Sequence, residues 1–375
     1  MFEHQDVLKE LNSSLPIGQK LSAVHRVLKL RFGFINRIAI ALYEPKTDIL
    51  KTFVDSSEGA SPLVHYQARL PESSSLRSIM ESCRPRVVED LSIFDASPND
   101  HAQKIRSYGY KSSYTMPMYV GGNFFGFVFF NSFQKNAFTP AVLHYLDVFG
   151  HLVSLVVINE INQIHTLLAA IKTARQMTHR RDPETGSHLD RMSRYAQLIA
   201  RELAEQYGFD DDAIEHIFLF APLHDIGKIS IPDRILLKPG KLTADEIDEM
   251  HTHAAKGREI IDGMITDFGL ESLQHVDILR NIAQFHHEAL DGSGYPDGLK
   301  GEAIPIEARI VAVADVFDAL TSTRPYKQAW TNDTAFDAIR KLSGIKLDAG
   351  CVEALCNKRD AVEEIQTCFQ EDFYG

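Results

Sequence analysis

A long helical stretch, residues 141–180, divides this sequence into two parts and constrains its fold more than any other feature. No Gly or Pro interrupts it after Gly150. A length of 375 residues also suggests two domains, and 44% hydrophobic residues are enough for two cores. We therefore expect an N-terminal domain over residues 1–150, a connecting helix over 151–180 and a C-terminal domain over 181–375.

The connecting helix carries an apolar repeat. Val157, Ile161, Ile164, Leu168 and Ile171 follow one another at spacings of four, three, four and three. This spacing is a heptad seam of about two repeats. It predicts a parallel homodimer formed through the connecting helix. The alternative is that the helix packs on its own domain.

The two flanking parts differ in their periodicity. Residues 21–30 predict a helix, residues 35–43 a strand, and residues 114–120 and 124–131 a hairpin turned by Gly121-Gly122-Asn123. After residue 182 the pattern is mainly helical, over 187–207, 212–224, 243–262, 273–287, 306–322 and 334–342, with a Gly/Pro-rich loop at 291–305. The predicted fold class is multidomain α+β, with a mixed α/β N-terminal domain and an all-α C-terminal bundle.

Composition limits the partners. A formal net charge of −12 argues against binding of long nucleic acid, whose phosphates repel an acidic surface. The apolar runs at 124–130 and 152–158 are too short to cross a bilayer, and the acidic N-terminus is unlike a signal peptide. The four cysteines form no CxxC pair, which fits a reducing cytoplasm. We expect a cytoplasmic protein without a membrane partner.

Histidines and carboxylates occur together in four short motifs of the C-terminal half. The motifs are Glu184 with His188; His224-Asp225 with Lys228; His253 with His286-His287; and Asp315 with Asp318. Imidazole nitrogens and carboxylate oxygens without a thiolate suit iron, manganese or a similar ion. The set exceeds the needs of one tetrahedral ion, so it predicts two or three divalent ions, and Asp225 could bridge two of them.

Each motif alone has a simpler interpretation. His224-Asp225 could end a helix or form an ion pair, and Glu184 with His188 could be a capping arrangement. Asp315 and Asp318 could lie on an exposed face. However, the apolar segments 217–223 and 310–313 directly precede carboxylates. Buried carboxylates need partners, and metal ions are the simplest partner common to all the motifs.

Two motifs carry a resemblance to a known family. His224-Asp225 resembles the pair that names the HD superfamily of metal-dependent phosphohydrolases, and Gly294-Tyr295-Pro296 resembles the second signature of its HD-GYP branch. Residues 182–355 are therefore similar to an HD-GYP domain. The resemblance implies hydrolysis of cyclic di-GMP at a centre of two or three ions, most often iron or manganese.

The resemblance also implies roles for single residues. Its metal ligands fall on Glu184, His188, His224, Asp225, His253, His286, His287 and Asp315. Its catalytic roles fall on Lys228, Asp225 and Asp318, and its substrate contacts on Arg324, Lys327, Tyr295 and Gly294. From the residues alone, Arg324 and Lys327 could instead be solvated cations, and the glycines a bare turn. The chain departs from the family pattern at 344–349, a segment that we expect to pack the C-terminal end.

The first 150 residues resemble a GAF sensor domain. Pro117 in a strand, the Gly121-Gly122 turn, Gly126 and the long exit helix carry this resemblance. The Asn-Lys-x-Phe-Asp-Glu signature of cyclic-nucleotide-binding GAF domains is absent. The resemblance implies an unidentified small ligand, whose binding could act on the enzyme through the connecting helix.

These features predict hydrolysis of cyclic di-GMP to linear pGpG, and a second cut to GMP would extend the reaction. If the protein is an enzyme with a different substrate, the alternative is a phosphodiesterase for cyclic GMP-AMP or for a linear dinucleotide. If the protein is not an enzyme, the alternative is a catalytically silent effector that binds a cyclic dinucleotide.

Overall fold

The protein is described here by a computed structural model, which covers residues 4–94, 100–177, 186–271, 274–323 and 328–370. The chain divides into two compact units, Met1–Asn162 and Gln163–Gly375. The boundary falls inside one long helix, α4 (Pro140–Met177). Glu184, Arg324 and Lys327 lie outside the described residues.

The N-terminal unit is built on one antiparallel sheet. Its strands are β1 (Arg37–Glu44), β2 (Ile49–Ser57), β3 (Gln67–Arg69), β4 (Arg86–Val88), β5 (Ser112–Val120) and β6 (Asn123–Ser132), in the order β3-β2-β1-β6-β5-β4. Each neighbouring pair is antiparallel. The predicted strand at 35–43 is β1, and the predicted hairpin is β5 with β6.

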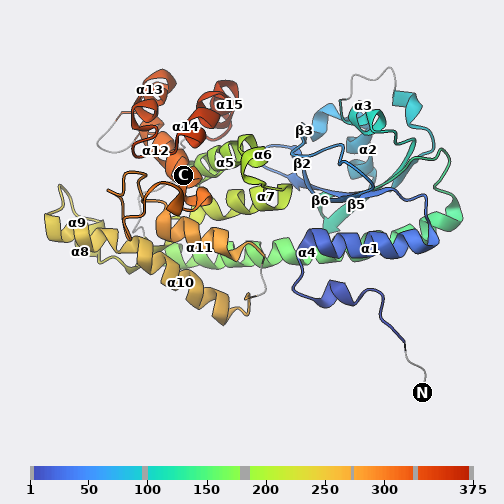
Figure 1. The fold of residues 1–375 in the computed structure, drawn as a ribbon, viewed down its shortest axis with the longest axis horizontal. Helices are drawn as coiled ribbons and strands as arrows, with labels where there is room; N and C mark the ends of the chain where they lie inside the picture. Colours follow the sequence, from blue (N-terminus) through green and yellow to red (C-terminus); the bar gives the residue numbers. More distant parts are fainter. Residues whose placement is uncertain (1–3, 95–99, 178–185, 272–273, 324–327, 371–375) are drawn as a thin grey trace. The chain divides into compact units, whose positions relative to one another are not determined.

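Side-chain alternation along β1 separates two apolar layers. Ile38, Ile40 and Leu42 share a core with α1 (Ile17–Arg31) and the N-terminal half of α4. Ala39 and Ala41 point to the opposite face, where α2 (Ser74–Ser82) covers them. Figure 1 shows α1 and α4 along one side of the sheet and α2 on the other, near α3 (Asp100–Ser107). The sheet is therefore buried between helices, as expected for an α/β domain.

The apolar repeat of α4 is used within the chain. Val157 and Ile161 are buried in the N-terminal core. Ile164 and Ile171 are buried in the C-terminal core, and Leu168 packs against it. The prediction that these residues form a homodimer seam is wrong, because their side chains are already covered by the chain's own cores.

Helix α4 also corrects the expectation about apolar length. Over Pro140–Ile171 it is long and apolar enough to cross a bilayer by length and composition, with a mean hydropathy of 1.8 and 28% of the apolar window buried. A helix at the centre of a protein core passes the same test. Leu146, Val153 and Val157 pack in the N-terminal core, but most of the apolar window is not buried, and one such helix is by itself weak evidence for a membrane span.

The described part of the C-terminal unit is helical. Its helices are α5 (Gly186–Glu202), α6 (Ala204–Tyr207), α7 (Asp211–Phe220), α8 (Asp233–Leu236), α9 (Ala244–His251), α10 (His253–Asp267), α11 (Val276–Phe285), α12 (Ile306–Thr321), α13 (Asn332–Leu342), α14 (Ala349–Cys356) and α15 (Arg359–Cys368). Short 3₁₀ turns η4 (Ala221–Leu223), η5 (Ile226–Ser230) and η6 (Gly301–Ala303) connect some of them. The predicted α+β fold class, with an all-α C-terminal part, is confirmed.

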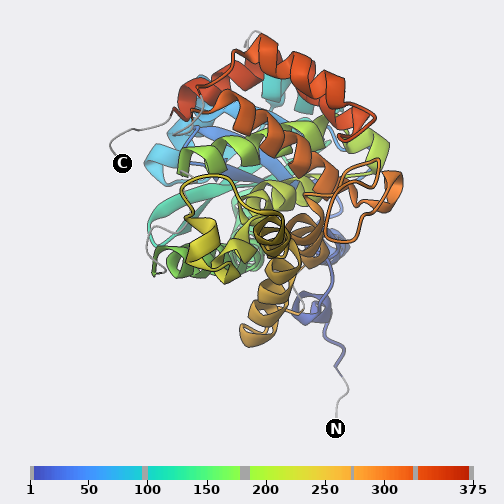
Figure 2. The ribbon, with the colours of Figure 1, turned by 90° about the vertical axis from the view of Figure 1, so that its left-hand side faces the viewer.

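Two details of this unit position the site. The predicted helix at 243–262 is two helices. Helix α9 begins with a capping box of Thr243 and Glu246 and ends at His251, and α10 begins at His253 after the intervening Thr252. Helices α13, α14 and α15, coloured red, lie together in both views (Figures 1 and 2). Buried Met192 and Tyr195 of α5 and Phe317 of α12 belong to the unit's apolar core.

Candidate metal centre

Seven of the eight predicted metal ligands come together in two groups. Asp225, His253, His286 and His287 form one group, and His188, His224 and Asp315 form the other. Within each group the possible ligand atoms lie within 4.8 Å of one another. The eighth predicted ligand, Glu184, is outside the described residues. The groups are drawn from helices that are distant in sequence, so the clustering is a product of the tertiary fold.

The ends of helices deliver most of these ligands. The turn η4, which follows α7, ends immediately before His224 and Asp225, and α11 ends immediately before His286 and His287. Asp315 comes from the middle of α12. Side chains at a helix end can converge without continuing the helical spiral, which explains how consecutive residues serve one site.

Gly227 allows a close approach between η5 and α10. A Cβ atom at this position would lie 1.8 Å from the backbone oxygen of His253 and 2.6 Å from the backbone nitrogen of Gly257. No side chain fits at such distances. The absence of a side chain at Gly227 therefore allows the segment with Asp225 to rest on the first turn of α10, beside His253.

Asp225 lies between the two groups. Its Oδ1 is 3.0 Å from Nε2 of His253 and 3.6 Å from Nε2 of His286. Its Oδ2 is 3.1 Å from Nε2 of His224 and 2.6 Å from Nζ of Lys228. The carboxylate thus directs one oxygen to each group, as a bridging ligand must.

The backbone fixes which ring nitrogen faces Asp225. Nδ1 of His253 lies 2.8 Å from the carbonyl of Met250, and Nδ1 of His286 lies 2.9 Å from that of Ile282. A carbonyl only accepts, so each Nδ1 carries the proton and each neutral ring presents a lone pair at Nε2. Neither Nε2, nor Oδ1 of Asp225, has a hydrogen-bond partner among the described residues. Acceptors that face one another in a buried site require a cation, so these residues fit a divalent metal.

The electrostatics agree with this interpretation. Burial alone would raise the pKa of the Asp225 carboxyl, but the charges of His224 and Lys228 hold it well below its usual range. Burial lowers the pKa of His286, and burial with the neighbouring His286 lowers that of His287. The site therefore combines a carboxylate with neutral imidazoles at His286 and His287, which are protonation states that bind metal.

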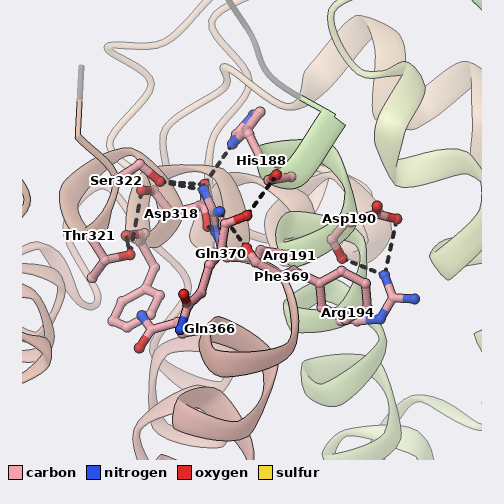
Figure 3. A network of polar contacts seen from close by, with 12 residues as sticks. His188, Asp190, Arg191, Arg194, Asp318, Thr321, Ser322, Gln366, Phe369 and Gln370 are labelled. Carbon is pink, nitrogen blue, oxygen red and sulfur yellow. Dashed lines mark hydrogen bonds and ion pairs between the residues drawn. The ribbon is translucent and has the colours of Figure 1, made fainter. Parts of the chain in front are cut away.

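The buried ion pair of Asp318 and Arg191 fixes the His188 ring through its Nδ1 (Figure 3). Nδ1 of His188 donates to Oδ2 of Asp318 at 2.7 Å. Arg191 donates to both oxygens of Asp318, through Nε at 2.7 Å and Nη2 at 2.9 Å, and Ser322 donates to it at 2.8 Å. Nε2 of His188 lies 3.9 Å from Oδ1 of Asp315. Asp318, predicted as a catalytic residue, is thus placed on the far side of His188 from Asp315.

The Gly-rich loop folds back on the paired histidines. The buried Glu288 carboxylate accepts from the backbone nitrogens of Asp297 at 2.7 Å and Leu299 at 2.9 Å. A Cβ atom on Gly294 would lie 2.5 Å from the His287 oxygen and 2.3 Å from the Ala289 nitrogen. The close contact of Gly294 is therefore with the chain's own backbone.

Tyr295 is the loop residue beside the centre. Its ring stacks on His251, with 3.8 Å between centroids and an interplanar angle of 14°. The ring centroid of His287 is 4.7 Å away. The segment 344–349, where the sequence differs from the family pattern, contacts the same loop. The backbone nitrogen of Leu290 donates to the backbone oxygen of Lys346 at 3.1 Å.

Sequence reasoning missed Arg191, His251 and Glu288. Arg191 follows His188 by three residues on one helix, which was a usable signal for a shared face. Glu288 directly follows the paired histidines, although nothing in its spacing indicates that it binds two backbone nitrogens of the loop. His251 carries no signal in the sequence beyond its nearness to His253.

Comparison with known proteins gives two family matches. Residues 179–350 match the model described as HD domain, and residues 21–157 match the model described as GAF domain. The cyclic di-GMP phosphodiesterase response regulator RpfG of Xanthomonas campestris pv. campestris is 50% identical over 185 residues, which are 49% of this chain and 46% of that protein.

Two proteins of Vibrio cholerae are also similar. A probable cyclic di-GMP phosphodiesterase is 38% identical over 214 residues, 54% of this chain and 47% of that protein. The 3′3′-cGAMP-specific phosphodiesterase 2 is 39% identical over 180 residues, 48% of this chain and 32% of that protein. The chain spans about half the length, or less, of these curated relatives. The two matches give a region similar to a GAF domain followed by a region similar to an HD domain, and the motifs at His224-Asp225 and Gly294-Tyr295-Pro296 resemble those of the HD-GYP branch.

Proposed function

We propose that the C-terminal unit is a metal-dependent phosphodiesterase that opens cyclic di-GMP to linear pGpG, with a second cut giving GMP. The observation that carries the proposal is the position of Asp225. Its two oxygens face two separate groups of histidines, which suits two divalent ions with a shared carboxylate. The names of the relatives support the choice of substrate.

The ligand set supports iron or manganese. It consists of imidazoles and carboxylates, and no cysteine is among the two groups. Glu184 would hold a third ion. When bound, these ions supply a hydroxide at neutral pH and neutralise charge on the phosphate.

The remaining chemistry belongs to the chain itself. Lys228 carries a positive charge 2.6 Å from Asp225, so it stabilises or protonates the departing 3′ oxygen. Asp318 and Arg191 keep the His188 ring in one orientation. Tyr295 offers a ring for stacking. Arg324 and Lys327 would hold the substrate phosphates, and Gly294 lets the loop pack against the backbone of His287.

Two other functions have some support. The cGAMP-specific relative at 39% identity favours cyclic GMP-AMP as the alternative substrate. A silent effector is disfavoured because such proteins commonly lose ligands, whereas seven predicted ligands cluster here.

The test uses the full chain, purified without oxygen and analysed for metal content. It is incubated separately with cyclic di-GMP, cyclic GMP-AMP and linear pGpG, and the products are separated by chromatography. The double variant His224→Ala/Asp225→Ala should lose both metal and turnover, whereas Asp277→Ala, an exposed carboxylate on α11, should keep both. Normal hydrolysis by the double variant would contradict the proposal.

The N-terminal unit is proposed to sense a small anion. A cavity of about 40 Å³ beside the sheet is lined by Arg86 together with Ser75, Ser113 and Thr115. Nε of Arg86 is buried without a hydrogen-bond partner among the described residues, and burial lowers the pKa of Arg86. Arg86 is partly buried, and its Nε offers a charged donor to a small carboxylate or oxyanion. Arg86→Met should abolish any response of turnover to that ligand without changing the basal rate.

A homodimer through helix α4 is retained as a proposal, on a face that begins before the connecting helix and extends into it. Tyr145, Val148, Leu152 and Leu155 repeat at spacings of three, four and three, and Val148 and Leu155 are 67% and 65% exposed. Val148→Glu with Leu155→Glu should convert a dimer to a monomer in light scattering.

All four cysteines are free, which supports a cytoplasmic location.

A further inference from the structure

The five candidate histidine ligands of the metal centre are oriented in two different ways. In four of them Nδ1 lies 2.7 to 3.0 Å from a carbonyl or carboxylate oxygen and donates to it. These four are His188, His224, His253 and His286. No such bond joins either ring nitrogen of His287 to another described residue. The chain must therefore hold the plane of the His287 ring by other contacts.

The ring of Tyr295 supplies one such contact. It lies against His287, with 4.7 Å between ring centroids and an interplanar angle of 34°. The backbone nitrogen of Tyr295 also donates to the backbone oxygen of His287 at 3.3 Å, so the loop is attached at the ligand itself. A flat ring that packs on another cannot turn about its Cβ–Cγ bond without losing dispersion contacts. Packing against Tyr295 therefore restricts the orientation of His287.

His251 holds the Tyr295 ring in turn. The two rings are almost parallel, at 14°, and their centroids are 3.8 Å apart. This is the shortest and flattest of the contacts between Tyr295 and the imidazoles around it, since the centroids of His287 and His253 are 4.7 and 6.0 Å away. His251 belongs to neither group of candidate ligand atoms among the described residues. Its ring is thus used for packing.

The break between α9 and α10 brings His251 to the same tyrosine as the ligand His253. On an unbroken α-helix, residues two positions apart point roughly 200° away from each other. His251 is the last residue of α9 and His253 the first of α10, with Thr252 between them. Both ring centroids nevertheless lie within 6.0 Å of that of Tyr295. A ligand and a supporting ring thus reach one tyrosine from adjoining helices.

We propose that His251 is a positioning residue, whose stack on Tyr295 fixes the plane of His287 and so strengthens binding of the ion at that ligand. Outer groups that orient metal-bound histidines commonly do so by hydrogen bonds; here a stack of rings takes that place. The inference rests on the proposed function through its metal centre, and it requires no particular substrate. Because the contact is between ring faces, another flat ring at position 251 should serve equally well.

The experiment measures manganese binding by the full-length protein without substrate. The metal-free wild type is compared with His251→Ala, which removes the ring, and with His251→Phe, which keeps a flat ring without nitrogens. Tyr295→Ala removes the middle of the stack, and His151→Ala, at an exposed histidine of α4, is the control. Manganese is titrated against a competing chelator, and the melting temperature of each metal-free protein is recorded.

The expected loss is confined to one ion per chain. His251→Ala should bind that ion about 3- to 10-fold more weakly, which corresponds to one aromatic contact, and Tyr295→Ala about 10- to 100-fold more weakly. His251→Phe should stay within about 2-fold of the wild type, and the control should be unchanged. The melting temperatures of the metal-free His251 variants should be close to that of the wild type.

Three results would overturn the inference. They are wild-type affinity in His251→Ala, an affinity in His251→Phe as low as in His251→Ala, and an equal weakening of every bound ion together with a lower melting temperature. A wild type that binds no manganese would overturn the inference and the metal centre together. Normal binding and the expected pattern of variants, without hydrolysis of any cyclic dinucleotide, would instead contradict the proposed function and leave this inference standing.

Discussion

Buried histidines occur in both units, yet the two units use them differently. His25 in the N-terminal unit is 4% exposed and His253 in the C-terminal unit is 2% exposed. Both ring nitrogens of His25 have partners in the chain, at 2.8 Å to Ser56 Oγ and 2.9 Å to the oxygen of Ile35. His253 has one nitrogen bonded to a carbonyl and the other aimed at Asp225. The number of ring nitrogens satisfied by the chain, rather than burial itself, separates a structural histidine from a ligand.

Asp225 gives the largest test of this contrast. Asp225→Ala removes the carboxylate that faces both groups, so metal content should fall and turnover should drop by more than about 10³-fold. Metal analysis and the rate of cyclic di-GMP hydrolysis measure the two effects. Chelation of the wild type should reproduce the loss of turnover, and added manganese should restore only the wild type. Retention of metal by the variant would show that Asp225 is not a ligand.

Asp318 tests whether the support behind a ligand matters. Asp318→Asn keeps the size of the side chain but weakens the hold on His188 and leaves Arg191 without its charge partner. Metal affinity should fall by about 10- to 100-fold, measured by competition with a chelator. The matched variant Asp333→Asn, at an exposed carboxylate of α13, should bind metal normally. An unaltered affinity in Asp318→Asn would remove the orienting role.

His25 should show the opposite behaviour. His25→Ala leaves Ser56 Oγ and the Ile35 carbonyl without their partner, so unfolding in denaturant should require about 1.5 kcal/mol less free energy. Metal content and turnover per folded molecule should not change. If metal content fell in His25→Ala, the distinction between the two kinds of buried histidine would fail.

Asp348 is a half-buried carboxylate that has hydrogen-bond partners within the chain, and it gives the smallest effect. Burial would raise the pKa of Asp348, but the backbone N–H of Cys351 and the guanidinium of Arg309 lower it below its ordinary value. The folded-state pKa is therefore below the unfolded one, so the stabilisation is complete above about pH 4 and is lost as pH falls through the folded-state pKa. Asp348→Asn should cost about 1 kcal/mol at pH 7 and should flatten this acid-dependent loss, measured by denaturant titrations at several pH values. A parallel pH dependence in both proteins would contradict it.

The sequence was most informative where local patterns and chemistry coincide. The strand pattern at 35–43 located β1, the Gly121-Gly122-Asn123 turn located the hairpin of β5 and β6, and the motifs located seven ligands that the fold brings together. The repeat in α4 was misleading because a heptad spacing is equally suited to a dimer seam and to an intramolecular core. Deciding between them requires knowing what lies opposite the helix, and that information is tertiary.

Long-range partners were the part that the sequence could not reveal. Arg191 binds Asp318, 127 residues further along the chain. Glu288 binds backbone nitrogens, which have no side-chain identity to detect. The break between α9 and α10 was missed because Thr252 does not interrupt the apolar periodicity on either side of it. Boundaries of this kind depend on packing against the rest of the unit.

Gly227 contributes no functional group, yet it sets a spacing on which the centre depends. The next smallest residue, alanine, would add one carbon at a point where 1.8 Å separates it from the backbone oxygen of His253. There is no side chain of intermediate size between hydrogen and methyl, so change at this position cannot be gradual. Variation of metal ligands can be compensated by another ligand or another ion, but a backbone contact has no substitute. The tolerance of this protein to change should therefore be lowest at a residue that takes no part in the proposed chemistry.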